Sequence, residues 1–184
     1  MTMGTSHPLQ ALRLVPDSVS FVAALLVRFP ELASVTFDPR AGTLRASLLV
    51  ARRLPAQPRA RFARRLLDAV AVLRELQGGP APEGEVRWQL GPNFTRFTLV
   101  RSVDDLTVEE LRVVAQLARD SFGGDLVAGQ ENPEEDDREE ELRYALEHVR
   151  HLRPSRPVVG VREGAEVFVY CAPRPTRRVR ERAP

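Results

Sequence analysis

The sequence has no lysine, only one cysteine and no long apolar run. All 27 Lys and Arg positions are therefore arginine. We attribute this to codon bias in a GC-rich genome, since arginine is chemically distinctive only where its guanidinium group meets a defined partner. The single cysteine, Cys171, excludes an intramolecular disulfide and gives no sign of an oxidising compartment. We therefore expect a cytoplasmic protein.

The longest apolar run covers residues 19–27, far fewer than the roughly 20 residues that a membrane-spanning helix needs. Only Arg13 is basic before this run, and the sequence that follows it, residues 28–31, is not a small-residue cleavage site. We expect neither export nor membrane association.

The length and composition are those of one folded domain. With 184 residues, 43% of them hydrophobic and 28% charged, the chain can bury a core without disulfides or metal ions. We expect a flexible N-terminus over residues 1–12, a single domain over 13–171 and a disordered tail rich in Arg and Pro over 172–184.

One pattern occurs three times along the chain: a segment of helical periodicity is followed by two short alternating strands joined by a turn. The turns are expected at Asp38–Gly42, Gly91–Asn93 and Arg162–Gly164. The pattern predicts an α+β fold, with a largely antiparallel sheet of about six strands built from three helix-plus-hairpin units and helices on one face.

Four helices are expected, over residues 17–29, 57–77, 104–122 and 137–152. Asp104 or Asp105 is the expected cap of the third helix, which Gly123 and Gly124 end. The inner face of the second helix is predicted from three- and four-residue spacing, and comprises Phe62, Leu66, Ala69, Val70, Leu73 and Leu76. Trp88 is the expected core anchor of the following strand.

Charge is distributed in blocks along the chain. Residues 1–103 carry 14 arginines against 7 acids, residues 104–147 carry 4 against 15, and residues 148–184 carry 9 against 3. The middle block includes an acidic linker near residues 125–137. Such blocks either attract one another within the chain or offer separate surfaces to charged partners, and the sequence does not choose between these.

Two arginine clusters are candidates for contacting the phosphates of nucleic acid. One is on the second helix and the other in the tail; together they comprise Arg59, Arg61, Arg64, Arg65, Arg174, Arg177, Arg178, Arg180 and Arg182. No exposed aromatic residues alternate with them, and no docking motif is recognised. The alternative is that the tail is a solubilising appendage and the helix arginines pair with the acidic segment.

Metal and thiol chemistry have weaker candidates. On the fourth helix His148 and His151 share a face with Tyr144, and Glu147 lies beside them, but a third firm ligand is missing. A solvated helix face is the ordinary explanation, and we predict no metal and no cofactor. Cys171 would be a nucleophile only beside an activating base; otherwise it is a half-buried strand residue.

The sequence as a whole favours a non-catalytic module that binds a protein partner or a second copy of itself. The binding surface is expected on the open side of the sheet, where Leu49, Phe168 and Tyr170 supply apolar area, on the acidic linker, or on both. A nucleic-acid accessory protein that uses the arginine clusters is the alternative. A metal-dependent or thiol-dependent enzyme is the third possibility.

Overall fold

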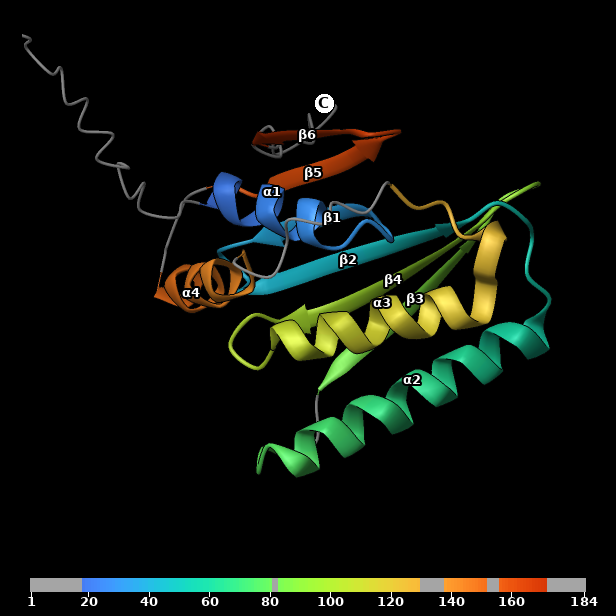
Figure 1. Cartoon of the computed structure of the whole chain (residues 1–184), viewed down its shortest axis with the longest axis horizontal. Coiled ribbons are helices and arrows are strands. Elements are labelled where there is room, and N and C mark those ends of the chain that lie inside the picture. The colour runs from blue at the N-terminus through green and yellow to red at the C-terminus, as the bar shows by residue number, and fades with distance from the viewer. Residues whose placement is uncertain (1–17, 81–82, 130–137, 152–155, 172–184) are drawn as a thin grey trace, which may run out of the picture.

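A computed structural model describes residues 18–80, 83–129, 138–151 and 156–171, which form an α+β fold with a six-stranded antiparallel sheet (Figure 1). The predicted fold class is therefore confirmed. The elements are α1 (Ser18–Arg28), β1 (Leu32–Asp38), β2 (Thr43–Val50), α2 (Ala56–Leu76), β3 (Gly84–Leu90), β4 (Thr95–Ser102), α3 (Val108–Phe122), the short 3₁₀ helix η1 (Gly123–Asp125), α4 (Arg138–His151), β5 (Val158–Glu163) and β6 (Glu166–Cys171). The predicted segments 1–12 and 172–184, and residues 130–137 of the predicted linker, lie outside the described residues.

The strands lie in the order β3-β4-β2-β1-β5-β6, and every neighbouring pair is antiparallel. The first hairpin, β1 and β2, is therefore central. The second hairpin joins it through β4 on β2, in register from Thr43 opposite Ser102 to Val50 opposite Thr95. The third joins it through β5 on β1, which leaves β3 and β6 as the two edge strands.

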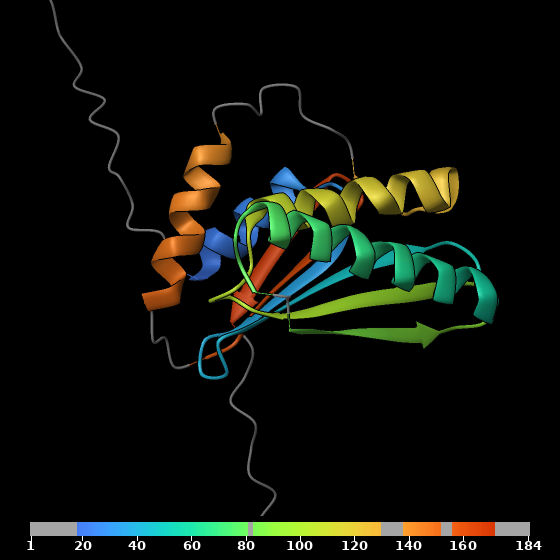
Figure 2. The same cartoon turned by 90° about the horizontal axis from the view of Figure 1, so that it is seen from below.

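One face of the sheet forms the core. Successive strand residues point to opposite faces. The residues on one face of the two longest strands are all buried: Leu44, Ala46, Leu48 and Val50 on β2, and Thr95, Phe97, Leu99 and Arg101 on β4. Figure 2 shows α2 and α3 over this face. Helix α1 contacts the same face through Phe21, whose ring centroid is 5.8 Å from that of Phe37 on β1.

Helix α1 packs closely against β5 because β5 has a glycine at the contact. A Cβ atom at Gly160 would lie 2.5 Å from side-chain atoms of Val22 and Leu26. Two residues further along β5, Arg162 donates hydrogen bonds to the carbonyl oxygens of Leu26 and Leu32. Since Leu26 lies in the last turn of α1, this contact satisfies a carbonyl that has no partner within the helix.

Helix α2 places Phe62 at the centre of an aromatic cluster. The Phe62 ring centroid lies 5.1 Å from that of Phe97, 6.1 Å from that of Trp88 and 4.7 Å from that of Phe122. The buried row continues at four-residue steps through Leu66, Val70 and Arg74. Prediction of Leu76 as a core residue was wrong: it is 81% exposed, because Arg74 takes the inward position in the last turn. Neither α2 nor another helix of the described residues is long and apolar enough to cross a membrane.

Helix α3 is capped by Thr107, so the prediction of Asp104 or Asp105 as its cap was wrong. The Thr107 hydroxyl accepts a hydrogen bond from the backbone N–H of Glu110 at 3.2 Å. Asp104 instead belongs to the preceding turn, where its backbone N–H donates to the Ser102 hydroxyl at 3.3 Å. The helix ends as predicted, before Gly123, whose φ of 50° favours glycine.

Candidate functional site

No described helix lies over the sheet face that points away from the core, which we call the open face (Figure 2). The strand registers arrange its residues in rows that run from β3 to β6. One row is Arg87, Thr98, Ser47, Ser34, Val161 and Phe168; the next is Glu85, Val100, Arg45, Thr36, Val159 and Tyr170. A third, interrupted at the β1 bulge, holds Gln89, Arg96, Leu49, Glu163 and Glu166. All six strands thus contribute to one surface.

The half of the open face formed by β2, β4 and β3 is basic. It carries the exposed side chains of Arg45, Arg87 and Arg96. Arg87 donates two hydrogen bonds to Glu85, from Nε to Oε1 at 2.8 Å and from Nη2 to Oε2 at 2.6 Å. These hydrogen bonds hold the pKa of Glu85 below its ordinary value, so this carboxylate stays ionised and neutralises one of the three arginines.

The other half, on β5 and β6, is apolar with an acidic corner. Phe168 and Tyr170 on the edge strand are 45% and 50% exposed. They stand opposite Val161 and Val159 of β5, which are half-buried. Where the hairpin turns, the exposed residues Glu163 and Glu166 stand opposite each other on the two strands, and neither has an ion-pair partner among the described residues. Charge on this half is therefore opposite to that on the first.

Small hydroxyl side chains from three neighbouring strands lie side by side on the open face. Ser34 and Thr36 on β1 lie beside Ser47 on β2, and the Ser47 hydroxyl is 2.9 Å from that of Thr98 on β4. The larger side chains on the open face of β2 are those of Arg45 and Leu49. Of the apolar residues predicted for this surface, Phe168 and Tyr170 are exposed, whereas Leu49 is half-buried.

The predicted arginine cluster on α2 is not uniform. Arg61, Arg64 and Arg65 are exposed, but the guanidinium group of Arg59 lies 6.0 Å from the centre of the Trp88 ring and is half-buried. Arg64 forms a long ion pair with Asp68 at 3.9 Å in an exposed setting, where such pairs contribute little. The tail arginines Arg174, Arg177, Arg178, Arg180 and Arg182 lie outside the described residues.

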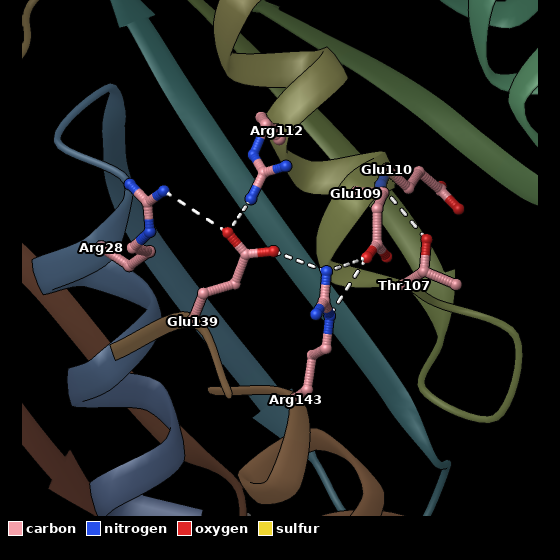
Figure 3. Close-up of polar contacts among 7 residues, drawn as sticks. All are labelled: Arg28, Thr107, Glu109, Glu110, Arg112, Glu139 and Arg143. Atoms are coloured by element: carbon pink, nitrogen blue, oxygen red, sulfur yellow. Dashed lines mark hydrogen bonds and ion pairs between the residues drawn. The ribbon is translucent and has the colours of Figure 1, made fainter. Parts of the chain in front are cut away.

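Glutamates in the first turns of α3 and α4 form ion pairs with arginines of three helices, as Figure 3 shows. Glu139 at the start of α4 contacts Arg112 on α3, lies 3.9 Å from Arg28 on α1 and 2.6 Å from Arg143 on its own helix. Arg143 also pairs with Glu109 on α3 at 2.5 Å. This network attaches α4 to α1 and α3, and its arginines are not those of α2.

Glu109 shows how the network affects a carboxyl group. Partial burial raises its pKa, but hydrogen bonds from the backbone and from Arg143 outweigh burial, and the net pKa is lowered. The hydrogen bond with Glu109 correspondingly raises the pKa of Arg143. These are the shifts of a structural ion pair, since a general acid or base at neutral pH needs a pKa moved toward 7.

The candidates for metal and thiol chemistry do not converge. The rings of His148 and Tyr144 stack with centroids 6.1 Å apart, while Glu147 and His151 are exposed on the same helix. Among the described residues, no three His, Cys, Asp or Glu side chains form a group suited to a metal ion. Cys171 is an exposed free thiol at the end of β6, rather than the half-buried residue expected from the sequence.

A shallow pocket of about 170 Å³ lies where the turn between β1 and β2 meets the end of α4. Its charged lining includes Arg40, Asp104 and Arg150. The Arg150 guanidinium group donates to the carbonyl oxygens of Val103 and Leu106, at 3.0 and 2.9 Å. Arg150 is thereby engaged in holding α4 to the loop before α3, and we assign the pocket no chemistry.

Sequence reasoning missed the basic half of the open face. Arg45, Arg87 and Arg96 come from three strands of two hairpins, and each is a single polar residue in an alternating segment. The alternation indicated that they point away from the core. Only the strand order, with β4 next to β2, brings them together.

Comparison of the chain with protein-family models, with curated proteins and with solved structures gives no match.

Proposed function

We propose that the protein is a non-catalytic binding or assembly module that holds a protein partner on its open face. The observation that carries this proposal is the exposure of two aromatic side chains, Phe168 and Tyr170, on a sheet face that no described helix covers. Large apolar side chains exposed together on a rigid surface are typical of interaction sites. The proposed location is the cytoplasm, in line with the single cysteine.

The distribution of charge on this face supports the same function. Aromatic residues supply binding energy when they are desolvated, whereas flanking charges orient the partner and reject unsuitable ones. On the open face, the aromatic residues lie between an acidic corner and a hydroxyl centre, with arginines beyond. Such a surface suits a folded protein of complementary shape and charge.

Site-specific photo-crosslinking in cells tests the proposal. Phe168 is replaced by p-benzoylphenylalanine, and the matched control carries the same replacement at Val72, which is 56% exposed on α2. We expect a discrete crosslinked species from position 168 and none of comparable yield from position 72. Absence of a discrete adduct at position 168, or equal adducts at both positions, would contradict the proposal.

A nucleic-acid-binding role is the second candidate, and the exposed Arg61, Arg64 and Arg65 on α2 favour it. These side chains lie within five residues on one helix, and only Arg64 has an ion-pair partner among the described residues. Clustered arginines of this kind bind phosphates with little sequence preference and with affinity that falls as salt rises.

Fluorescence anisotropy with labelled RNA and DNA, at low and at physiological salt, tests this second role. The full chain is compared with a chain that ends at Cys171 and with an Arg61→Glu, Arg65→Glu variant. Salt-sensitive binding that decreases in either altered chain supports the role and assigns it to the tail or to α2. If the full chain shows no binding at low salt, the arginines do not bind nucleic acid.

A further inference from the structure

We propose that the partner on the open face is a second copy of this chain, stacked face to face about a two-fold axis. The axis runs parallel to the strands, between β1 and β2. This inference rests on the proposed function, because it requires the open face to be a binding surface. The observation that carries it is that one half of this face is basic and the other acidic, so the face is complementary in charge to a second copy of itself.

The two halves of the open face have opposite charge. The half on β2, β4 and β3 carries three arginines and one carboxylate, Glu85. The half on β5 and β6 carries Glu163 and Glu166, with no basic side chain on the open face. A two-fold axis through the centre places each half against the opposite half of the second copy, so every contact between the halves is formed twice.

Strand order specifies which elements meet in such a pair. Rotation about the axis between β1 and β2 exchanges the two ends of the order β3-β4-β2-β1-β5-β6. Strand β3 then lies over β6 of the second copy, β4 over β5, and β2 over β1. Because the axis is parallel to the strands, the two sheets are aligned, which is the usual arrangement of sheets that pack face to face.

The rows of the open face then predict individual contacts. Arg96 on β4 and Glu163 on β5 belong to the same row, so each Arg96 faces Glu163 of the second copy. Arg87 on β3 shares a row with Phe168 on β6, which places a guanidinium group over an exposed aromatic ring. Arginine side chains are long enough to reach these partners across twisted sheets.

The centre of the face permits the close approach that this pair requires. Stacked sheets lie about 10 Å apart, and the side chains of both inner faces must fit between them. Near the axis, Ser34, Thr36 and Ser47 are small, and the longer side chain of Arg45 on β2 lies over Thr36 of the second copy. Next to them Val100 meets Val159 of the second copy. Toward the edges, the large side chains of Arg96 and Arg87 meet Glu163 and Phe168 of the second copy.

A nucleic acid on this face is the less favoured occupant. Its bases would stack on Phe168 and Tyr170, but its phosphates would then lie beside Glu163 and Glu166. Like charge at that position repels a polyanion. The same acidic corner attracts the basic half of a second copy, and for this reason we choose the dimer.

Sedimentation equilibrium of the purified full chain tests the dimer. Four proteins are compared with the wild type: Arg96→Glu, Glu163→Arg, the variant with both changes, and the control Arg64→Glu on α2. The charges of Arg96 and Glu163 have no ion-pair partner among the described residues, so folding is expected to be unaffected, which circular dichroism checks. Each single change creates two like-charge contacts in the dimer.

We expect the wild type to dimerise, and each single change to raise the dimer dissociation constant by about tenfold or more. The double change restores dimerisation, because it rebuilds the pair with reversed charge, and the control leaves it unchanged. A wild type that stays monomeric at all concentrations overturns the proposal. So does a dimer that the single changes do not weaken, or that the double change does not restore. If the photo-crosslinked adduct at position 168 contains a different protein, the open face is still a binding surface, but the proposal that its partner is a second copy is overturned.

Discussion

Arg101 on β4 and Glu110 on α3 form an ion pair that is almost completely removed from water, with 2% and 1% of their side chains exposed. Arg101 Nε donates to Glu110 Oε1 at 2.7 Å and Nη2 donates to Oε2 at 3.2 Å. Arg101 also donates to the carbonyl oxygen of Glu83. The pair therefore ties the first turn of α3 to the strand beneath it, and leaves both charges satisfied.

Replacing Glu110 by Gln removes one charge of this pair and leaves Arg101 buried without its counter-ion. We expect the free energy of unfolding to fall by about 3 kcal/mol, since removing one partner strands the other in a medium of low polarity. Urea denaturation followed by circular dichroism measures the change.

Two further variants separate the effect of burial on stability from the effect of charge. Glu85→Gln breaks a hydrogen-bonded pair that is exposed, so stability should barely change. Arg101→Met with Glu110→Leu removes both charges, and should recover stability to within about 1 kcal/mol of the wild type. If Glu110→Gln is no more destabilising than Glu85→Gln, the pair is not buried as described.

Gly160 is expected to tolerate no side chain. A Cβ atom there would lie 2.5 Å from Val22 and Leu26, so Gly160→Ala should push α1 away from β5 at a cost of about 1–3 kcal/mol. Gly124→Ala is the control, because nothing lies within 4 Å of a Cβ atom at that position. Thermal denaturation of both variants measures the difference; equal effects would show that α1 does not pack on β5 at this glycine.

The recurring order of helix and hairpin made the fold class predictable from the sequence. Alternation along Leu44, Ala46 and Leu48, together with the turn at Asp38–Gly42, was sufficient to place β2 and its buried face. Helix caps were less predictable, since Asp104, Asp105 and Thr107 are all good capping residues and only packing of α3 selects Thr107. The burial of Glu110 against Arg101 was not predictable, because it depends on contacts between a helix and a strand that a sequence pattern does not contain.

The candidate site was predictable only in part. Phe168 and Tyr170 were identified from alternation within one strand. The basic half of the open face was not, because Arg45 is separated from Arg87 and Arg96 by a whole helix and its proximity depends on strand order. The α2 arginines are close together in the sequence and were therefore predicted to form one basic cluster, yet the guanidinium group of Arg59 lies over the ring of Trp88. Clustering in sequence is a poor guide to clustering on a surface formed by strands.

Acid should weaken the network that holds α4. The pKa of Glu109 is lowered in the folded protein from its ordinary value of 4.5, so its contribution to stability is complete above that value and is lost as pH falls through the folded pKa. We expect Glu109→Gln to lower the free energy of unfolding at neutral pH by less than about 1 kcal/mol, because the pair is partly exposed. The difference from wild type should vanish in acid.

Urea denaturation of wild type and Glu109→Gln across a series of pH values measures this dependence. Arg143→Met provides the control, since without Arg143 the replacement of Glu109 should have a smaller effect at neutral pH. A difference between wild type and Glu109→Gln that persists or grows below the folded pKa would refute the role given to this ion pair.

The proximity of Ser34 to its counterpart in a second copy gives the most direct test of the open face as the dimer surface. Ser34 lies on β1 beside the proposed axis, so two cysteines introduced there should be joined by a short bismaleimide reagent. The measurement is the yield of covalent dimer for Ser34→Cys in a Cys171→Ser background, with Val72→Cys on α2 as the control. We predict a high yield of covalent dimer for Ser34→Cys and a low yield for Val72→Cys. If Ser34→Cys stays monomeric after treatment, or if both variants give equal yields, the face-to-face dimer is contradicted.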